Sequence, residues 1–158
     1  MTDDQVARHL RRANEVARRA AGMGRHPFGA LLVAPDGETV LAEQGNIDTV
    51  NHAESTLARH AASNYPGTYL RDCTLVTTFE PCAMCAGTVY WAGIGRVVYG
   101  ASEESLLALT GSHEENPTLS LPCREVFARG QRPIDVIGPV DSLVDVMVEP
   151  HLGFWSAR

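Results

Sequence analysis

Three potential metal ligands and one carboxylate stand out in the sequence, because together they could form a single reactive centre. His52 is followed two residues later by Glu54, and the pair Cys82 and Cys85 comes further along the chain. One imidazole and two thiolates form a ligand set that suits Zn²⁺. Three protein ligands leave a tetrahedral ion one open position, where a catalytic site holds water and a structural site places a fourth ligand. Glu54 is near enough to His52 to handle the proton of such a water.

The spacing of the cysteines predicts how they are presented. Cys82 and Cys85 are three residues apart, so on a helix they lie on one face, one turn from each other. Pro81 is tolerated in a first helical turn, which predicts that this helix starts near Pro81. The thiols would then lie at the positive end of the helix dipole, where the thiolate form that binds metal is favoured.

The histidine and the glutamate also constrain their own setting. On an ideal helix, His52 and Glu54 point about 200° apart around the axis, because each residue turns the chain by about 100°. They can share one small site only if they occupy the first residues of a helix, viewed end-on. Asn51 directly before His52 is a suitable N-cap for such a helix.

Two other interpretations of the cysteines stay open at this point. A Cys-x-x-Cys pair in a cytosolic protein can be a redox dithiol, and a pair that opens a helix suits that chemistry as well. A structural zinc site would need a fourth protein ligand, for which Cys123, His60 and His113 are conceivable donors. The combination of His52, Glu54 and a proline-led helix start favours catalytic zinc over both.

The segments that carry these residues resemble the cytidine deaminase superfamily. The pattern His-x-Glu followed by Pro-Cys-x-x-Cys is typical of zinc deaminases, in which the glutamate is the general acid–base and not a ligand. The similarity extends from about Pro27 to Ala101, and it is nearest to guanine deaminases, fungal cytosine deaminases and tRNA adenosine deaminases. The segments that carry it are His52-Ala53-Glu54, Glu80-Pro81-Cys82-Ala83-Met84-Cys85-Ala86-Gly87 and Arg96-Val97-Val98-Tyr99-Gly100.

This resemblance implies hydrolytic deamination of an aminated heterocycle, with zinc held by His52, Cys82 and Cys85. Zinc lowers the pKa of a bound water toward neutrality, and Glu54 passes the water's proton to the ring and to the leaving amine. We expect a free aminated nucleobase of the guanine, isoguanine or cytosine type as the substrate. A nucleoside deaminase and a tRNA adenosine deaminase are the enzymatic alternatives, and a structural zinc module or a redox protein is the non-catalytic one.

The resemblance also suggests which residues contact the substrate. An asparagine shortly before the histidine motif hydrogen-bonds the substrate in the resembled families, and Asn46 matches it, although asparagine is also a common turn residue. Phe28 and Trp91 match aromatic positions that line guanine deaminase pockets, but Phe28 is just as plausible in the core and Trp91 in core or dimer packing. Ala53, between the ligand and the acid–base, completes the expected substrate-binding set.

Composition limits the class of protein. A chain of 158 residues suits one domain, here expected to span residues 1–158. The formal charge is −6 and all 13 basic residues are arginine, which argues against a nucleic-acid surface. Four cysteines form no disulfide framework in a chain of this length, which suits a reducing compartment. The sequence shows neither a signal peptide nor an apolar run long enough for a membrane span, so we expect a cytoplasmic protein.

The elements that must position these residues alternate between helix and strand. This order predicts a three-layer α/β/α domain with a mixed, mainly parallel sheet. Sites in such sheets form beyond the carboxyl ends of strands, at helix N-termini, where His52 and Cys82 both fall. The resemblance implies five strands in the order 2-1-3-4-5. The expected strands are residues 27–33, 39–43, 73–79, 96–100 and 134–138, with 39–43 as the antiparallel return strand after 27–33. The expected helices are residues 6–20, 52–63, 81–91, 102–109 and 143–148, and a capping box at Thr2-Asp3-Asp4-Gln5 precedes the first of them.

Three expectations concern the surface and the partners. Residues 111–132 show little periodicity apart from a possible short turn at 124–128, and segments this long are functional or disordered. We expect that segment and the aromatic end Gly153-Phe154-Trp155 to close over a free base. The arginines of the first helix are most simply a solvated face, with an RNA-contacting surface as the minority interpretation. We expect a homodimer, by resemblance and because two-fold dimers are the commonest oligomers.

Overall fold

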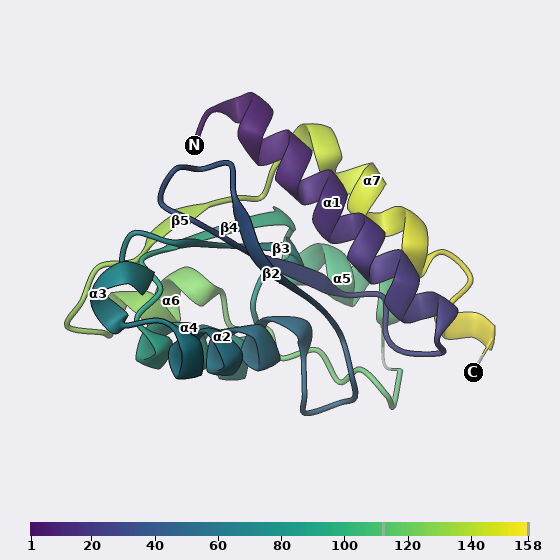
Figure 1. The fold of residues 1–158 in the computed structure, drawn as a ribbon. Helices are drawn as coiled ribbons and strands as arrows, with labels where there is room; N and C mark the ends of the chain where they lie inside the picture. The colour runs from purple at the N-terminus through teal and green to yellow at the C-terminus, as the bar shows by residue number, and fades with distance from the viewer. Residues whose placement is uncertain (112, 158) are drawn as a thin grey trace.

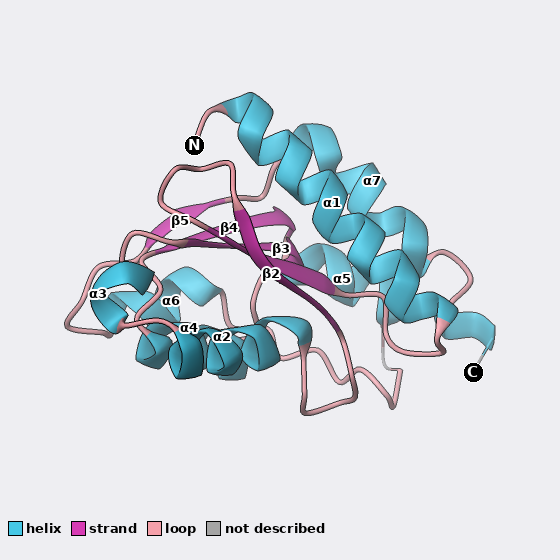
Figure 2. Cartoon of the chain, viewed as in Figure 1, coloured by secondary structure: helices cyan, strands magenta, loops and turns pink. Residues whose placement is uncertain are grey.

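A five-stranded sheet separates two layers of helices in the computed structural model, which describes residues 1–111 and 113–157 (Figures 1 and 2). The strand order is β2-β1-β3-β4-β5, as the resemblance implied. The three-layer α/β/α architecture is therefore confirmed. The strands are β1 (Gly29–Val33), β2 (Val40–Gly45), β3 (Thr74–Phe79), β4 (Arg96–Ala101) and β5 (Asp135–Ile137).

The directions of the strands make the sheet a mixed one. β1 runs antiparallel to both β2 and β3, whereas β3 with β4 and β4 with β5 are parallel pairs. The sheet is mixed, as expected: β1 alone runs opposite to the other four strands, and two of the four strand pairs are parallel. A tight turn with Gly37 at a φ of 74° joins β1 to β2, and a connection this short can only link antiparallel strands.

Each face of the sheet packs on its own set of helices. Neighbouring residues of a strand point to opposite faces, so on β3 Leu75 enters one core and Val76 the other. The Val76 core contains residues of α1, α5 and α7, and the Leu75 core contains residues of α2, α4 and α6. The helices are α1 (Asp3–Gly22), α2 (Ala53–Asn64), α3 (Gly67–Leu70), α4 (Ala83–Ala92), α5 (Glu103–Thr110), α6 (Cys123–Ala128) and α7 (Val144–Val148).

The sequence predicted few details for two segments, residues 111–132 and the C-terminal residues from 143 onward. Within 111–132, the possible short turn is a helix, α6, which begins at the buried Cys123 and packs Phe127 into the core. α7 is five residues long and is followed by two 3₁₀ turns, Glu149–His151 and Trp155–Ala157. Within the part of the chain that the structure describes, no helix has the length and apolarity needed to cross a membrane.

Candidate metal centre and pocket

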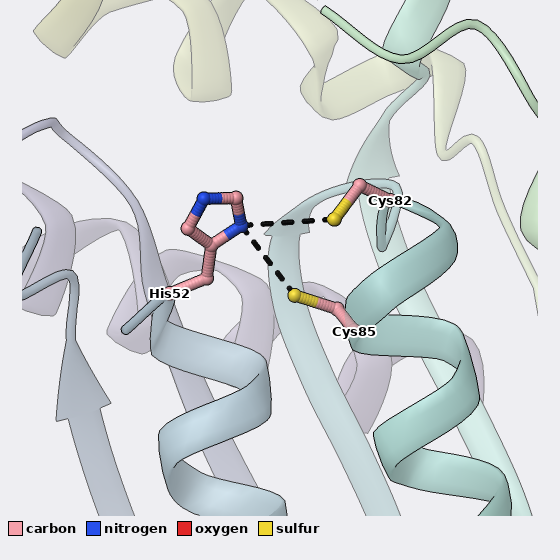
Figure 3. A group of neighbouring side chains, drawn as sticks. All are labelled: His52, Cys82 and Cys85. Carbon is pink, nitrogen blue, oxygen red and sulfur yellow. Dashed lines mark hydrogen bonds between the residues drawn. The ribbon is translucent and has the colours of Figure 1, made fainter. Parts of the chain in front are cut away.

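The three expected zinc ligands lie together at one edge of the sheet (Figure 3). His52 Nδ1 is 3.5 Å from Cys85 Sγ and 3.7 Å from Cys82 Sγ, and the three ligand atoms all lie within 4.8 Å of one another. Zn–S bonds of about 2.3 Å and Zn–N bonds of about 2.05 Å, at a tetrahedral angle, would place nitrogen and sulfur about 3.6 Å apart. The donor set and its spacing therefore fit Zn²⁺ without rearrangement.

His52 is held in the orientation that a metal ligand needs. It is the N-cap of α2, and its Nε2 lies 3.1 Å from the carbonyl oxygen of Thr49. Donation of the Nε2 proton to that carbonyl fixes the tautomer in which Nδ1 is free to bind metal. Asn51 is not the N-cap as expected, because its side chain bonds the Asp48 carboxylate and the helix begins one residue later.

The two cysteines lie in the first turn of α4, which begins at Ala83, close to the start expected from Pro81. Cys82 is the N-cap and Cys85 the third residue of the helix. A hydrogen bond from Cys85 and another with His52 lower the pKa of the Cys82 thiol to about 4. The Cys82 sulfur and burial raise the pKa of Cys85, so the second thiol proton leaves only when a cation replaces it.

Glu54 occupies the second position of α2, beside the ligands but not among them. Its side chain is buried, Thr77 Oγ1 donates to its Oε1 at 2.7 Å, and Cys85 Sγ lies 3.7 Å from its Oε2. Burial raises the pKa of the Glu54 carboxyl above its usual range. A carboxyl group with a raised pKa accepts a proton more readily than an exposed one would, and it can then return that proton, as a general acid–base must.

A pocket of about 350 Å³, its open mouth included, lies over this centre. His52, Glu54 and Cys82 form its floor, and the expected substrate residues Asn46 and Phe28 line it as well. Asn46 is 1% exposed, and its Nδ2 donates to the Asp48 carbonyl at 3.0 Å. No hydrogen-bond partner for Asn46 Oδ1 occurs among the described residues, so this acceptor is available to a ligand.

Two residues of the expected substrate set are not brought to this pocket. Trp91, near the end of α4, is 85% exposed and lies apart from the pocket of its own chain. Ala53 is fully buried as the first residue of α2, and its side chain packs into the core on the α2 face of the sheet.

The candidate fourth ligands lie elsewhere. Among the described residues, only His52 and the two cysteines bring three metal-ligating side chains close enough together to hold one ion. Cys123 is buried in the core at the start of α6, where burial raises the pKa of its thiol to about 12. His60 is exposed on α2, and His113 contacts the Trp155 ring. The centre thus keeps an open position, as a catalytic site requires.

Two pocket residues were not anticipated from the sequence. Glu80, directly before Pro81, accepts from the Cys123 amide at 2.9 Å and from the Glu103 amide at 3.3 Å. Glu103, the first residue of α5, lines the pocket with Leu106 and is 7% exposed. Burial and the nearby negative charges of Cys82, Glu54 and Glu80 raise the pKa of Glu103 to about 8. A glutamate in a helix's first turn is a common sequence feature, which gave no signal that this one is buried.

The 111–132 segment and the C-terminal end both reach the neighbourhood of the pocket. Asn116 lines it, and Glu115 pairs with His26 at 3.2 Å. His151 contacts the rings of the pocket residues Phe28 and Phe79, with centroids 5.1 and 4.7 Å away.

The aromatic C-terminal end packs on those contacts. Trp155 donates from Nε1 to His151 Nδ1 at 3.2 Å, and its ring lies 4.8 Å from that of His26. The ring of Phe154 lies 5.1 Å from that of Trp155. The C-terminal aromatic residues therefore buttress the pocket from behind its Phe28 and Phe79 wall.

Comparison with known proteins agrees with this geometry. Residues 3–101 match the family model of the cytidine and deoxycytidylate deaminase zinc-binding region. A probable cytosine deaminase of Schizosaccharomyces pombe is 35% identical over 151 residues, which cover 94% of this chain and 91% of that protein. A tRNA-specific adenosine deaminase of Haemophilus influenzae is 38% identical over 99 residues, which cover 60% of this chain and 57% of that protein.

A solved structure extends the agreement to the fold. The guanine deaminase of Nitrosomonas europaea superposes with a TM-score of 0.69 at 24% identity, over 94% of this chain and 83% of that one. The ligand geometry and the matched region agree on zinc as the cofactor, and the Schizosaccharomyces pombe relative agrees on deamination as the class of chemistry. The chain belongs to the cytidine and deoxycytidylate deaminase family of zinc-dependent enzymes.

Proposed function

We propose that this deaminase acts on a free aminated nucleobase or a closely related amino-heterocycle, and that His52, Cys82 and Cys85 hold its zinc. The observation that carries the proposal is the small pocket over the metal centre, in which an acid–base carboxyl and an unpaired amide oxygen face one cavity. The space of about 350 Å³ includes open solvent at the mouth of the pocket, so the enclosed part over the metal centre is smaller still. A single heterocycle suits this space.

The residues of the pocket can carry out each proton transfer of the hydrolysis. Bound zinc supplies Lewis acidity that makes a water molecule acidic near neutral pH. Glu54 accepts a proton from the attacking water and delivers it to a ring nitrogen, so that the amino-bearing carbon becomes electrophilic. The hydroxide oxygen bonds to that carbon, and Glu54 moves the remaining proton of the added hydroxyl to the amine. The C–N bond then breaks, and ammonia leaves as the ring carbonyl forms. Asn46 orients the ring through its free Oδ1.

The surface of α1 supports a small substrate over an RNA. Four arginines of this helix form ion pairs with glutamates of neighbouring elements, at N–O distances between 2.5 and 3.3 Å. Phosphate binding draws on unpaired basic side chains, and each neutralised phosphate steepens the salt dependence of affinity. The solvated-face interpretation of these arginines is therefore the better supported one. The pairs are Arg8–Glu38, Arg12–Glu43, Arg18–Glu149 and Arg19–Glu43.

Ammonia release from a substrate panel tests the proposal. The zinc-loaded protein is assayed with guanine, isoguanine and cytosine, with the nucleosides of these bases, and with an anticodon stem-loop that carries adenosine at the wobble position. We expect turnover of at least one free base and a lower kcat/KM for its nucleoside. Inosine formation in the RNA with inert free bases would refute the proposal, and activity on nucleosides alone would refute its closed-pocket part.

We also propose that the enzyme is a homodimer. Trp91 is 85% exposed on the outer side of α4, where it lines a shallow depression with the small residues Ala62, Ala83 and Gly87. A large aromatic ring beside small side chains is typical of an interface, whereas a solvent-facing tryptophan gains nothing from exposure. Light scattering at micromolar concentration should give twice the chain mass, and Trp91→Glu should shift it toward the monomer. A monomeric wild-type protein would refute the dimer.

A further inference from the structure

Three carboxyl groups line the pocket, and two of them are already engaged. Glu54 bonds Thr77 and contacts Cys85, as its acid–base role requires. Both oxygens of Glu80 accept main-chain N–H groups. Glu103 differs, because its Oε2 is buried and has no hydrogen-bond partner in the described part of the chain.

An unpaired buried carboxyl oxygen is costly, so its presence calls for an explanation. Leaving such a group without a partner destabilises the folded protein, and more so if the group is charged. Solvent does not supply the missing hydrogen bond, since Glu103 is 7% exposed and lines the pocket. It is not needed to cap α5 either, because the Ser102 hydroxyl already accepts from the Ser105 amide. A ligand in the pocket can satisfy the free oxygen.

On this basis we propose that Glu103 is a substrate-recognition residue that accepts a hydrogen bond from a ring N–H of the heterocycle. The inference rests on the proposed function and deepens it. The pocket holds a second unpaired acceptor, Asn46 Oδ1, so it favours a ligand with N–H donors besides the amine that leaves. Free bases carry such ring N–H groups. Attachment of a sugar or an alkyl group at the nitrogen that Glu103 contacts removes the donor.

The chemistry holds whichever protonation state Glu103 adopts. A carboxylate offers two acceptor oxygens, and a neutral carboxyl still offers one acceptor beside its own donor. Glutamine keeps the acceptor oxygen at the same reach, whereas alanine removes it. Glu103→Gln should therefore retain most of the recognition that Glu103→Ala loses. Glu104→Ala, which removes an exposed carboxyl from the same helical turn, is the matched control.

A cycle that combines protein variants with methylated ligands tests the contact directly. kcat and KM are measured with the most active free base of the panel and with each of its ring N-methyl derivatives, for the wild type, Glu103→Gln, Glu103→Ala and Glu104→Ala. We expect Glu103→Ala to lower kcat/KM for the parent base about 10- to 100-fold, mostly through KM. One methyl derivative should lose a similar factor in the wild type but little in Glu103→Ala, since the two changes remove the same bond.

A binding measurement separates failure of this inference from failure of the proposed function. The shift in Tm caused by each base is measured for zinc-loaded wild type and Glu103→Ala, and the melts without base show that the variant folds. A base that stabilises the wild type but not Glu103→Ala supports recognition by Glu103, even if no base is deaminated. The inference is overturned if Glu103→Ala matches Glu104→Ala in both assays, or if all methyl derivatives lose the same factor in wild type and Glu103→Ala.

Discussion

The two sides of the pocket are built in different ways. The zinc side is formed by His52, Glu54, Cys82 and Cys85, which are the N-caps and first-turn residues of α2 and α4. The outer side, formed by Glu103, Leu106 and Asn116, comes from the start of α5 and the segment after it. The family model matches residues 3–101, so it covers the whole zinc side and stops before the outer side.

This division separates the reaction from the choice of substrate. Helix N-termini hold their first residues to within the small tolerances that metal ligation and proton transfer need, and every deaminase of this type needs the same groups. The outer side of the pocket contacts only the substrate, so its residues need not meet the geometric requirements of metal ligation and proton transfer. Changes on the zinc side should therefore abolish the chemistry, whereas changes on the outer side should alter which ring is accepted.

The largest effect is expected from Cys85→Ser. Loss of one thiolate leaves two protein ligands, so the protein should lose both zinc and deaminase activity. Metal content per chain after dialysis is the measurement, with Cys123→Ser as the control because Cys123 lies in the core away from the ligands. Retention of tightly bound zinc in Cys85→Ser would break the assignment of the zinc side.

Glu54→Gln should come next, with zinc retained and turnover lowered about 10²–10⁴-fold. The amide keeps the size of the side chain and can still bond Thr77, but it cannot accept the water's proton. The test is kcat for the best substrate, together with zinc content and Tm. A variant with more than about a tenth of the wild-type rate would remove Glu54 from proton transfer.

Asn46→Ala tests whether the matched region also contributes to substrate binding. Asn46 lies within that region, but we propose that it bonds the substrate ring and not the metal. Loss of its hydrogen bond should lower kcat/KM about 10- to 100-fold, mainly by raising KM, while zinc content stays at the wild-type level. Steady-state kinetics beside metal analysis provides both numbers. An unchanged KM would mean that Asn46 is only a structural turn residue, held by its bond to the Asp48 carbonyl.

The smallest effect concerns the free energy of unfolding and the C-terminal aromatic cluster, which consists of His151, Phe154 and Trp155. Burial and the neighbouring His26 lower the pKa of His151 to about 4, from 6.5. The unfolded chain takes up a proton below pH 6.5 that the folded chain refuses until about pH 4, so this group's contribution to stability is present above pH 6.5 and lost as pH falls. The slope approaches about 1.4 kcal/mol per pH unit.

His151→Phe should remove that part of the acid sensitivity. Thermal melts between pH 7.5 and 4.5 should show a smaller fall in Tm than in the wild type, whatever the cost of leaving Trp155 Nε1 without its acceptor. His60→Phe, at an exposed position, should keep the wild-type slope. If Tm fell equally with pH in all three proteins, His151 would be protonated as easily in the folded protein as in the unfolded chain, and the C-terminal aromatic cluster would not shield it.

The sequence allowed prediction of the zinc side almost in full. Its ligands follow from residue type and short spacing, and the requirement that His52 and Glu54 share a site placed them at a helix start, where they lie. The sheet order came from the resemblance, and apolar runs located the strands. The cap residue was missed, because Asn51 bonds Asp48 instead of the helix amides, a choice that local propensity does not decide.

Features that depend on distant contacts could not be predicted. β3 pairs with β1 although β2, α2 and α3 lie between them in the sequence, and no local pattern records which strands become neighbours. Glu103 is buried because α5 begins at the pocket, and Trp91 is exposed because it lies on the face of α4 that is turned away from the core. Apolar periodicity was equally weak for α6, whose six residues are held by core contacts of Cys123 and Phe127.

The two bonds of Glu80 have a consequence for how such an enzyme can diverge. The Glu80 carboxylate holds the first residues of α5 and α6 beside the metal centre, because it accepts hydrogen bonds from their main-chain N–H groups. Amide N–H groups are the same for every residue but proline, so mutation at positions 103 and 123 leaves the attachment intact. The outer wall can thus acquire new side chains, and new substrates, while its backbone stays docked to an unchanged catalytic apparatus.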